Sequence, residues 1–153
     1  MTVETLQDSL DWSQQLHERL AQSLLHCSQQ TDDQRLKWLL DYLVEHEQSL
    51  AKNLARFREQ ADPKALHTWI YDYIAHMDIH PANKFAGMPE PSMDFDAICD
   101  GVFDAHNRII SLFRYLGRHA DIPEAETLVE NLLGLEEHET MLIAQQINRL
   151  RDM

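Results

Sequence analysis

Two similar stretches, each an apolar stripe interrupted by a His-Glu pair, constrain the fold most strongly. Residues 43–50 and 135–142 align without a gap at a spacing of 92 residues. With the leucines just before them, at 36 and 40 and at 128 and 132, both stretches show alternating spacings of four and three, which is the spacing of one buried helix face. A glutamate stands where the next buried residue belongs, and burying a carboxylate costs several kcal/mol unless it is paired or bound to a metal. The matched pairs are Leu43/Leu135, Glu45/Glu137, His46/His138, Glu47/Glu139 and Leu50/Leu142.

The same spacing predicts four long helices, at about residues 3–28, 34–60, 94–117 and 123–151. The segment at 61–93 holds four of the five prolines, so we expect a long crossover there, with one short aromatic-rich helix between Lys64 and Met77. Short loops make the first two helices, and likewise the last two, antiparallel neighbours. The prediction is a single all-α domain, a four-helix bundle of two hairpins joined by the crossover.

Histidines interrupt the apolar stripes of the first and third long helices. His17 and His106 each occupy an inward position among leucines, isoleucines and valines. At roughly 1.5 Å per residue, His17 and Glu47 lie at similar heights above the turn that joins their helices, and His106 and Glu139 do so in the second hairpin. Imidazoles and carboxylates around a bundle axis suit iron, manganese or zinc. The predicted metal ligands for one or two ions are His17, His46, Glu47, His106, His138 and Glu139, with Glu18 and Glu136 in reserve.

These features resemble the ferritin-like superfamily, particularly its rubrerythrin-type members. The resemblance implies a four-helix bundle with one crossover and a di-iron centre held by glutamates and by Glu-x-x-His motifs. In one register Glu47 and Glu139 match the motif glutamates, but Leu50 and Leu142 stand in the histidine places. In the other, His46 and His138 match the motif histidines, but Leu43 and Leu135 stand in the glutamate places. Half of each motif is therefore missing, and the resemblance implies metal handling or redox chemistry without specifying an enzymatic reaction.

Two alternatives accompany this interpretation. The chain is similar to hemerythrin-like cation-binding domains in carrying a histidine on each long helix, which implies a di-iron protein. A buried His/Glu layer is equally compatible with a metal-free interaction or regulatory bundle in which the polar network fixes helix pairing. His76 and His80 form a further His-x-x-x-His pair in the crossover, for which the sequence suggests no role.

Charge and cysteine content limit the classes of binding partner and the cellular location that we expect. The formal net charge of −13 argues against nucleic acid and against anionic membrane surfaces, and no apolar run reaches transmembrane length. Cys27 and Cys99 form neither a zinc motif nor a disulfide framework, and no signal peptide is evident, so we expect a cytoplasmic protein. Large apolar groups beyond one inward stripe predict a homodimer, with any other protein partner unspecified. These groups are Trp12, Leu16, Trp38 and Leu39.

Overall fold

The protein is all-helical over the residues that a computed structural model describes, 3–70 and 87–152, apart from its loops and one isolated β-bridge. The long helices are α1 (Leu6–Gln30), α2 (Gln34–Gln60), α5 (Phe95–Arg118) and α6 (Pro123–Arg151), and a single turn of helix forms α3 (Pro63–Leu66). The predicted bounds of the long helices therefore hold to within three residues. None of the helices in these ranges is long and apolar enough to cross a membrane.

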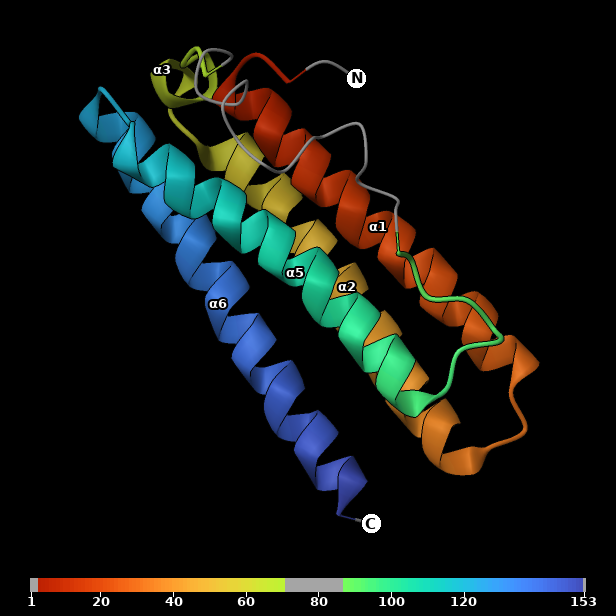
Figure 1. The fold of residues 1–153 in the computed structure, drawn as a ribbon. Coiled ribbons are helices and arrows are strands. Elements are labelled where there is room, and N and C mark those ends of the chain that lie inside the picture. Colours follow the sequence, from red (N-terminus) through yellow and green to blue (C-terminus); the bar gives the residue numbers. More distant parts are fainter. Residues whose placement is uncertain (1–2, 71–86, 153) are drawn as a thin grey trace.

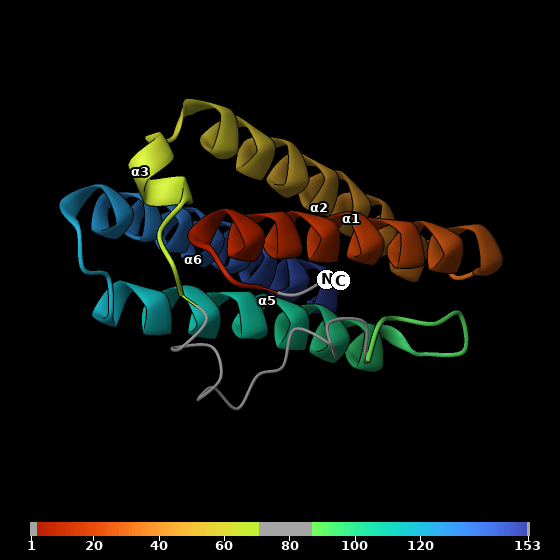
Figure 2. The same ribbon diagram turned by 90° about the horizontal axis from the view of Figure 1, so that it is seen from above.

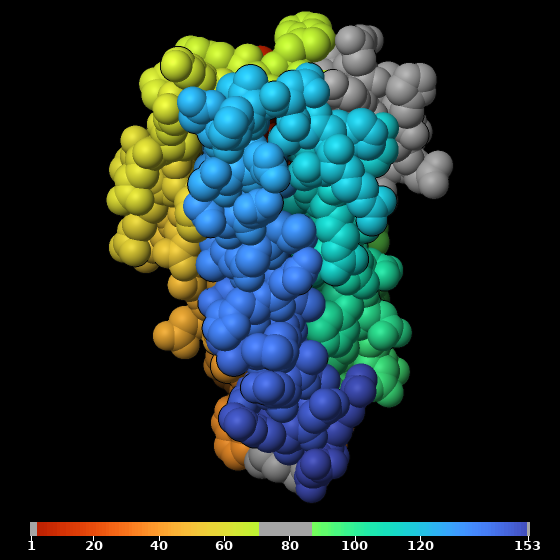
Figure 3. All heavy atoms as spheres, turned by 90° about the vertical axis from the view of Figure 1, so that its left-hand side faces the viewer, coloured from red at the N-terminus to blue at the C-terminus, as the bar shows by residue number. Residues whose placement is uncertain are grey.

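The four long helices run side by side along a common direction (Figures 1 and 2). α1 packs against α2 and α5, and α6 packs against the same two helices. Figure 3 looks onto the face where α6 lies between α2 and α5. Around the bundle the order is thus α1, α2, α6, α5, with α1 diagonal to α6 and α2 diagonal to α5. In Figure 1, α2 and α5 run in the same direction and α1 and α6 in the opposite one.

The segment after α2 closes one end of the bundle. Asp62 caps α3, which contacts α1 and α6. The chain then pairs with the residues before α1, because Leu6 N–H donates to Thr68 O at 2.9 Å and Ile70 N–H donates to Glu4 O at 2.8 Å. Of the short helix expected between Lys64 and Met77, the chain up to residue 70 contains only the turn of α3, which ends at Leu66. A β-bridge between Thr5 and Trp69 follows it in place of further helix. Residues 71–77, and the pair His76 and His80, lie outside the described residues.

The bundle core consists of the inward stripes of all four long helices. Its largest fully buried side chains are Trp12 and Phe113, surrounded by leucines. Trp12, Leu16 and Leu39 are at most 1% exposed, because α1 packs against α2 and α5, and α2, which carries Leu39, packs against α1 and α6. Of the four residues on which the homodimer was predicted, Trp38 alone is exposed, at 49%.

Candidate metal centre

Four ionisable side chains are buried together in the middle of the core. His17 on α1, Glu47 on α2, His106 on α5 and Glu136 on α6 are each 0% exposed. Each stands on the inward stripe of its helix, so the same spacing that buries the neighbouring leucines also carries these groups inward. Every long helix therefore contributes one polar side chain to this cluster.

Hydrogen bonds connect the four groups across the bundle. His17 donates from Nδ1 to Glu47 Oε2 at 2.5 Å and from Nε2 to Glu136 Oε1 at 2.7 Å. His106 Nε2 donates to the other carboxylate oxygen of Glu47, Oε1, and its Nδ1 lies 2.8 Å from the hydroxyl of Thr140. The two imidazole rings meet edge to face, with centroids 5.2 Å apart. Glu47 is thus shared by both histidines.

The charges in this cluster support one another. Burial alone would lower the pKa of His17, but the carboxylates of Glu136 and Glu47 outweigh burial and raise that pKa to about 10. Burial would raise the pKa of Glu47, but the adjacent His106 and His17 lower it to about 2. Because an ionised carboxylate only accepts hydrogen bonds, His17 donates from both nitrogens and is positively charged near neutral pH.

One oxygen of the cluster has no partner. Glu136 Oε2 is buried and accepts no hydrogen bond from any of the described residues. Leaving a buried acceptor unsatisfied costs roughly 1–3 kcal/mol, more for a charged one. This oxygen is where the cluster has capacity to accept a further group.

Three of these residues meet the geometric requirement for holding an ion. One ligand atom from each of His17, Glu47 and His106 lies within 4.8 Å of the others. Two imidazoles with one carboxylate form a donor set typical of iron, and compatible with zinc and manganese. The buried group can therefore hold a metal ion, with Glu136 immediately beside it.

The remaining predicted ligands lie elsewhere. His46 bonds Glu139 at 3.1 Å from Nδ1 to Oε2, and these two side chains are 24% and 19% exposed. His138 is exposed, and so is Glu18, which bonds Gln14. The prediction that Glu139 belongs to the buried layer is wrong, because Glu136, named only in reserve, occupies that place.

The spacing between the two halves explains this difference. His106 follows His17 by 89 residues, and Glu136 follows Glu47 by the same 89. The buried stripe of α6 continues from Glu136 to Ile143, Ile147 and Leu150, whereas Leu135 and Leu142 are only half-buried. The spacing of 92 aligned two similar stretches of sequence, but it placed the wrong face of α6 toward the core. The histidine spacing of 89 is the sequence signal that would have identified Glu136.

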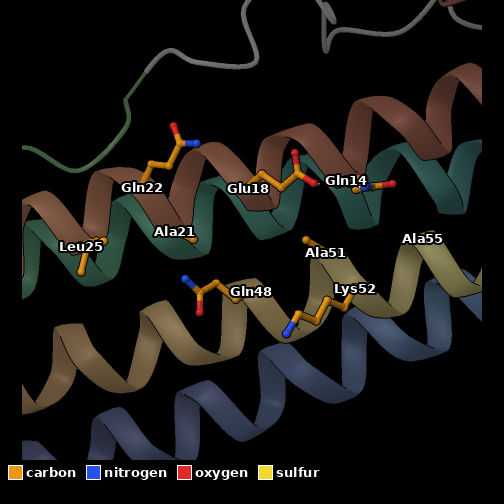
Figure 4. A pocket seen from close by; sticks show the side chains of 9 residues that line it. All are labelled: Gln14, Glu18, Ala21, Gln22, Leu25, Gln48, Ala51, Lys52 and Ala55. Atoms are coloured by element: carbon orange, nitrogen blue, oxygen red, sulfur yellow. Dashed lines mark hydrogen bonds between the residues drawn. The ribbon is translucent and has the colours of Figure 1, made fainter.

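A surface groove runs along α1 and α2, with a volume of about 550 Å³. Figure 4 shows the side chains that both helices contribute to it. Ala21 and Ala51, which follow His17 and Glu47 by one helical turn, are among its lining residues, together with polar groups such as Glu18 and Lys52. The four cluster residues are not among them, so the groove passes beside the cluster without reaching its charged groups.

Comparison of the chain with protein-family models, with curated proteins and with solved structures found no match in any of the three.

Proposed function

We propose that this protein binds one divalent transition-metal ion, iron, manganese or zinc, in the core of its helical bundle. His17, Glu47 and His106 would supply the ligands, and Glu136 would lie beside the ion. The observation that carries the proposal is a fully buried His₂Glu group next to a carboxylate oxygen that no described residue satisfies. Three protein ligands leave coordination positions for water or a small molecule, which is typical of sites that react rather than of closed structural sites.

Removing water from these groups is costly, and a bound ion offsets that cost. A buried charge pair is often no more stable than apolar residues of the same volume. A divalent ion would compensate the charges of Glu47 and Glu136, and the unpartnered oxygen of Glu136 could bond the ion or a water on it. An ion also requires neutral imidazoles, so its binding would release the proton that His17 holds in the metal-free cluster.

The helix arrangement supports a ferritin-like connectivity as part of this proposal. Two antiparallel hairpins, the long connection between α2 and α5, and the parallel course of those two helices are the features in its favour. The ligand set favours one ion over a di-iron centre, because Leu50 and Glu139 stand three residues after Glu47 and Glu136, where rubrerythrin-type motifs have histidines. The hemerythrin-like alternative loses support, since His46 and His138 lie outside the cluster.

A metal-free interaction bundle is the second candidate. The observation in its favour is that three of the four ionisable groups in the cluster already satisfy one another, with His17 held charged between two carboxylates. In this alternative the layer fixes which helices pair, and the acidic surface or the groove of Figure 4 meets a partner.

Metal content distinguishes these candidates. The protein would be purified without a histidine tag, stripped with chelator, and titrated with Fe(II), Mn(II) or Zn(II), with bound metal measured by elemental analysis. We expect about one ion per chain in the wild type and in His46→Ala, and none in His17→Ala. Absence of bound metal in the wild type under all three titrations would leave the metal-free candidate.

Location and assembly remain part of the proposal. Two free cysteines, Cys27 and Cys99, are buried, which suits a reducing cytosol. The homodimer now depends on Trp38, with exposed Leu25 and Met141 elsewhere on the surface.

A further inference from the structure

The two histidines of the cluster present different ring nitrogens to Glu47. His17 directs Nδ1 at this carboxylate, and His106 directs Nε2 at it. The other nitrogen of each ring is occupied by a residue of α6: Glu136 bonds Nε2 of His17, and Thr140 bonds Nδ1 of His106. Residues four apart lie on one face of a helix, so a single face of α6 holds the outer sides of both imidazoles.

We infer that a metal ion in this cluster is bound through unlike nitrogens, Nδ1 of His17 and Nε2 of His106, and that Glu136 and Thr140 are the positioning residues that select them. The inference rests on the proposed metal site. A metal-bound histidine almost always donates its remaining N–H to an acceptor, which fixes the tautomer and the orientation of the ring. Here both acceptors are already in place, at 2.7 and 2.8 Å.

The hydroxyl of Thr140 suits both states of the cluster. Without metal, Nε2 of His106 carries a proton, because the ionised Glu47 only accepts hydrogen bonds. Nδ1 then either accepts from the Thr140 O–H or, where it carries a proton, donates to the Thr140 oxygen. With an ion on Nε2, the one remaining ring proton would stand on Nδ1 and donate to the Thr140 oxygen. A hydroxyl can donate or accept by rotating, whereas a valine of the same shape can do neither.

Thr140 also makes the two halves of the cluster unequal. The 89-residue spacing that relates His17 to His106 places Ala51 at the position corresponding to Thr140. Ala51 cannot form a side-chain hydrogen bond, and the outer partner of His17 is instead the carboxylate Glu136. Thr140 occupies Nδ1 of His106, and Glu136 Oε2 has no partner among the described residues. One ligand histidine is therefore supported by an anion and the other by a neutral hydroxyl, which makes His17 the more basic ligand.

The nitrogen assignment is testable on the intact wild-type protein. ¹⁵N-labelled protein, stripped with chelator and loaded with one equivalent of Zn(II), would be examined by long-range ¹H–¹⁵N spectroscopy, which identifies the protonated nitrogen of each imidazole. We expect Nε2–H for His17 and Nδ1–H for His106. Zinc bound with both rings protonated at the same nitrogen overturns this inference alone. A wild type that binds no zinc overturns both the inference and the proposed function.

The role of Thr140 is tested by three threonine variants. Thr140→Val should lower zinc affinity by about 10- to 100-fold, which is the usual effect of losing such an outer partner, whereas Thr140→Ser should keep it within a few-fold of the wild type. Thr127→Val, the same exchange at an exposed site of α6, serves as the control and should bind as the wild type does. Wild-type affinity in Thr140→Val, or equal losses in the Val and Ser variants, would exclude a positioning role. Should the valine variant fail to fold, the serine variant and the wild-type nitrogen assignment still decide.

Discussion

Glu47→Gln is the substitution that tests the charge network most directly. Glu47 accepts hydrogen bonds from both histidines and is fully buried. Glutamine has the same shape but only one accepting oxygen, so its amide N–H₂ would face an imidazole donor. The substitution also removes one of the two carboxylates that hold His17 charged.

The expected loss follows from this geometry. Removing one partner of a buried pair costs roughly 3–5 kcal/mol, because the other charge stays buried without compensation. His106 can relieve part of the cost by accepting at Nε2 and donating from Nδ1 to Thr140, which favours the lower end of this range. In a chain of this length each kcal/mol shifts Tm by roughly 2–4 °C, so the metal-free variant should melt about 6–12 °C below the wild type.

Glu139→Gln supplies the matched control. Glu139 also pairs with a histidine, His46, but both side chains are partly exposed. Solvent screening limits such pairs to about 0–1 kcal/mol. Urea denaturation of chelator-treated protein would give the free energy of unfolding for both variants at pH 6. A loss in Glu47→Gln no larger than that in Glu139→Gln would refute the claim that the core network holds its charges by mutual compensation.

Two further predictions concern the pH dependence of stability and the substitution of the proposed metal ligand His106. The pKa of His17 is raised from 6.5 to about 10, so the stability that this histidine contributes is complete below pH 6.5 and is lost as pH rises through 10. The pKa of Glu47 is lowered from 4.5 to about 2, so the stability that this carboxylate contributes is present above pH 4.5 and is lost as pH falls through 2. Denaturation of chelator-treated protein between pH 5 and 10 should therefore show declining stability above pH 6.5, with a flatter profile in Glu47→Gln, and equal slopes would contradict the assignment. His106→Leu should abolish metal binding, keep the helical circular dichroism spectrum, and cost roughly 1–3 kcal/mol in the metal-free state because Glu47 Oε1 loses its partner. Wild-type metal content in that variant would exclude His106 as a ligand.

The sequence predicted the inward groups of three helices but not of the fourth. His17, Glu47 and His106 each stand in the four-three pattern of a mainly apolar stripe, so the helical period alone placed them in the core. In α6 two overlapping stripes compete, since Leu135 and Leu142 offer one continuation and Ile143 and Ile147 another. Packing against both α2 and α5 selects the second, and the selection depends on tertiary contacts that local periodicity does not contain.

The surface of the first hairpin was harder to predict for a related reason. Trp12, Leu16 and Leu39 exceed what one stripe can hide, which suggested a second copy of the chain as their cover. In the bundle α1 is flanked by α2 and α5, and α2 by α1 and α6, so these side chains are buried within the chain itself. An excess of apolar residues thus indicates that a helix has two neighbours, and it does not identify the chain from which they come.

The placement of the cluster would couple the proposed metal binding to the packing of the two hairpins. Each hairpin contributes one histidine and one glutamate, and the bonds His17–Glu136 and His106–Glu47 run along the two diagonals of the bundle. Neither hairpin alone contains the two imidazoles, so the His₂Glu group forms only where α1 and α2 meet α5 and α6. An ion that binds only the packed bundle would stabilise it over separated hairpins by RT ln(1 + [L]/Kd), about 2.7 kcal/mol when the free ion is a hundredfold above Kd. The buried His/Glu cluster interrupts the apolar core of the metal-free protein. The same cluster is where a bound metal ion would hold the two hairpins together.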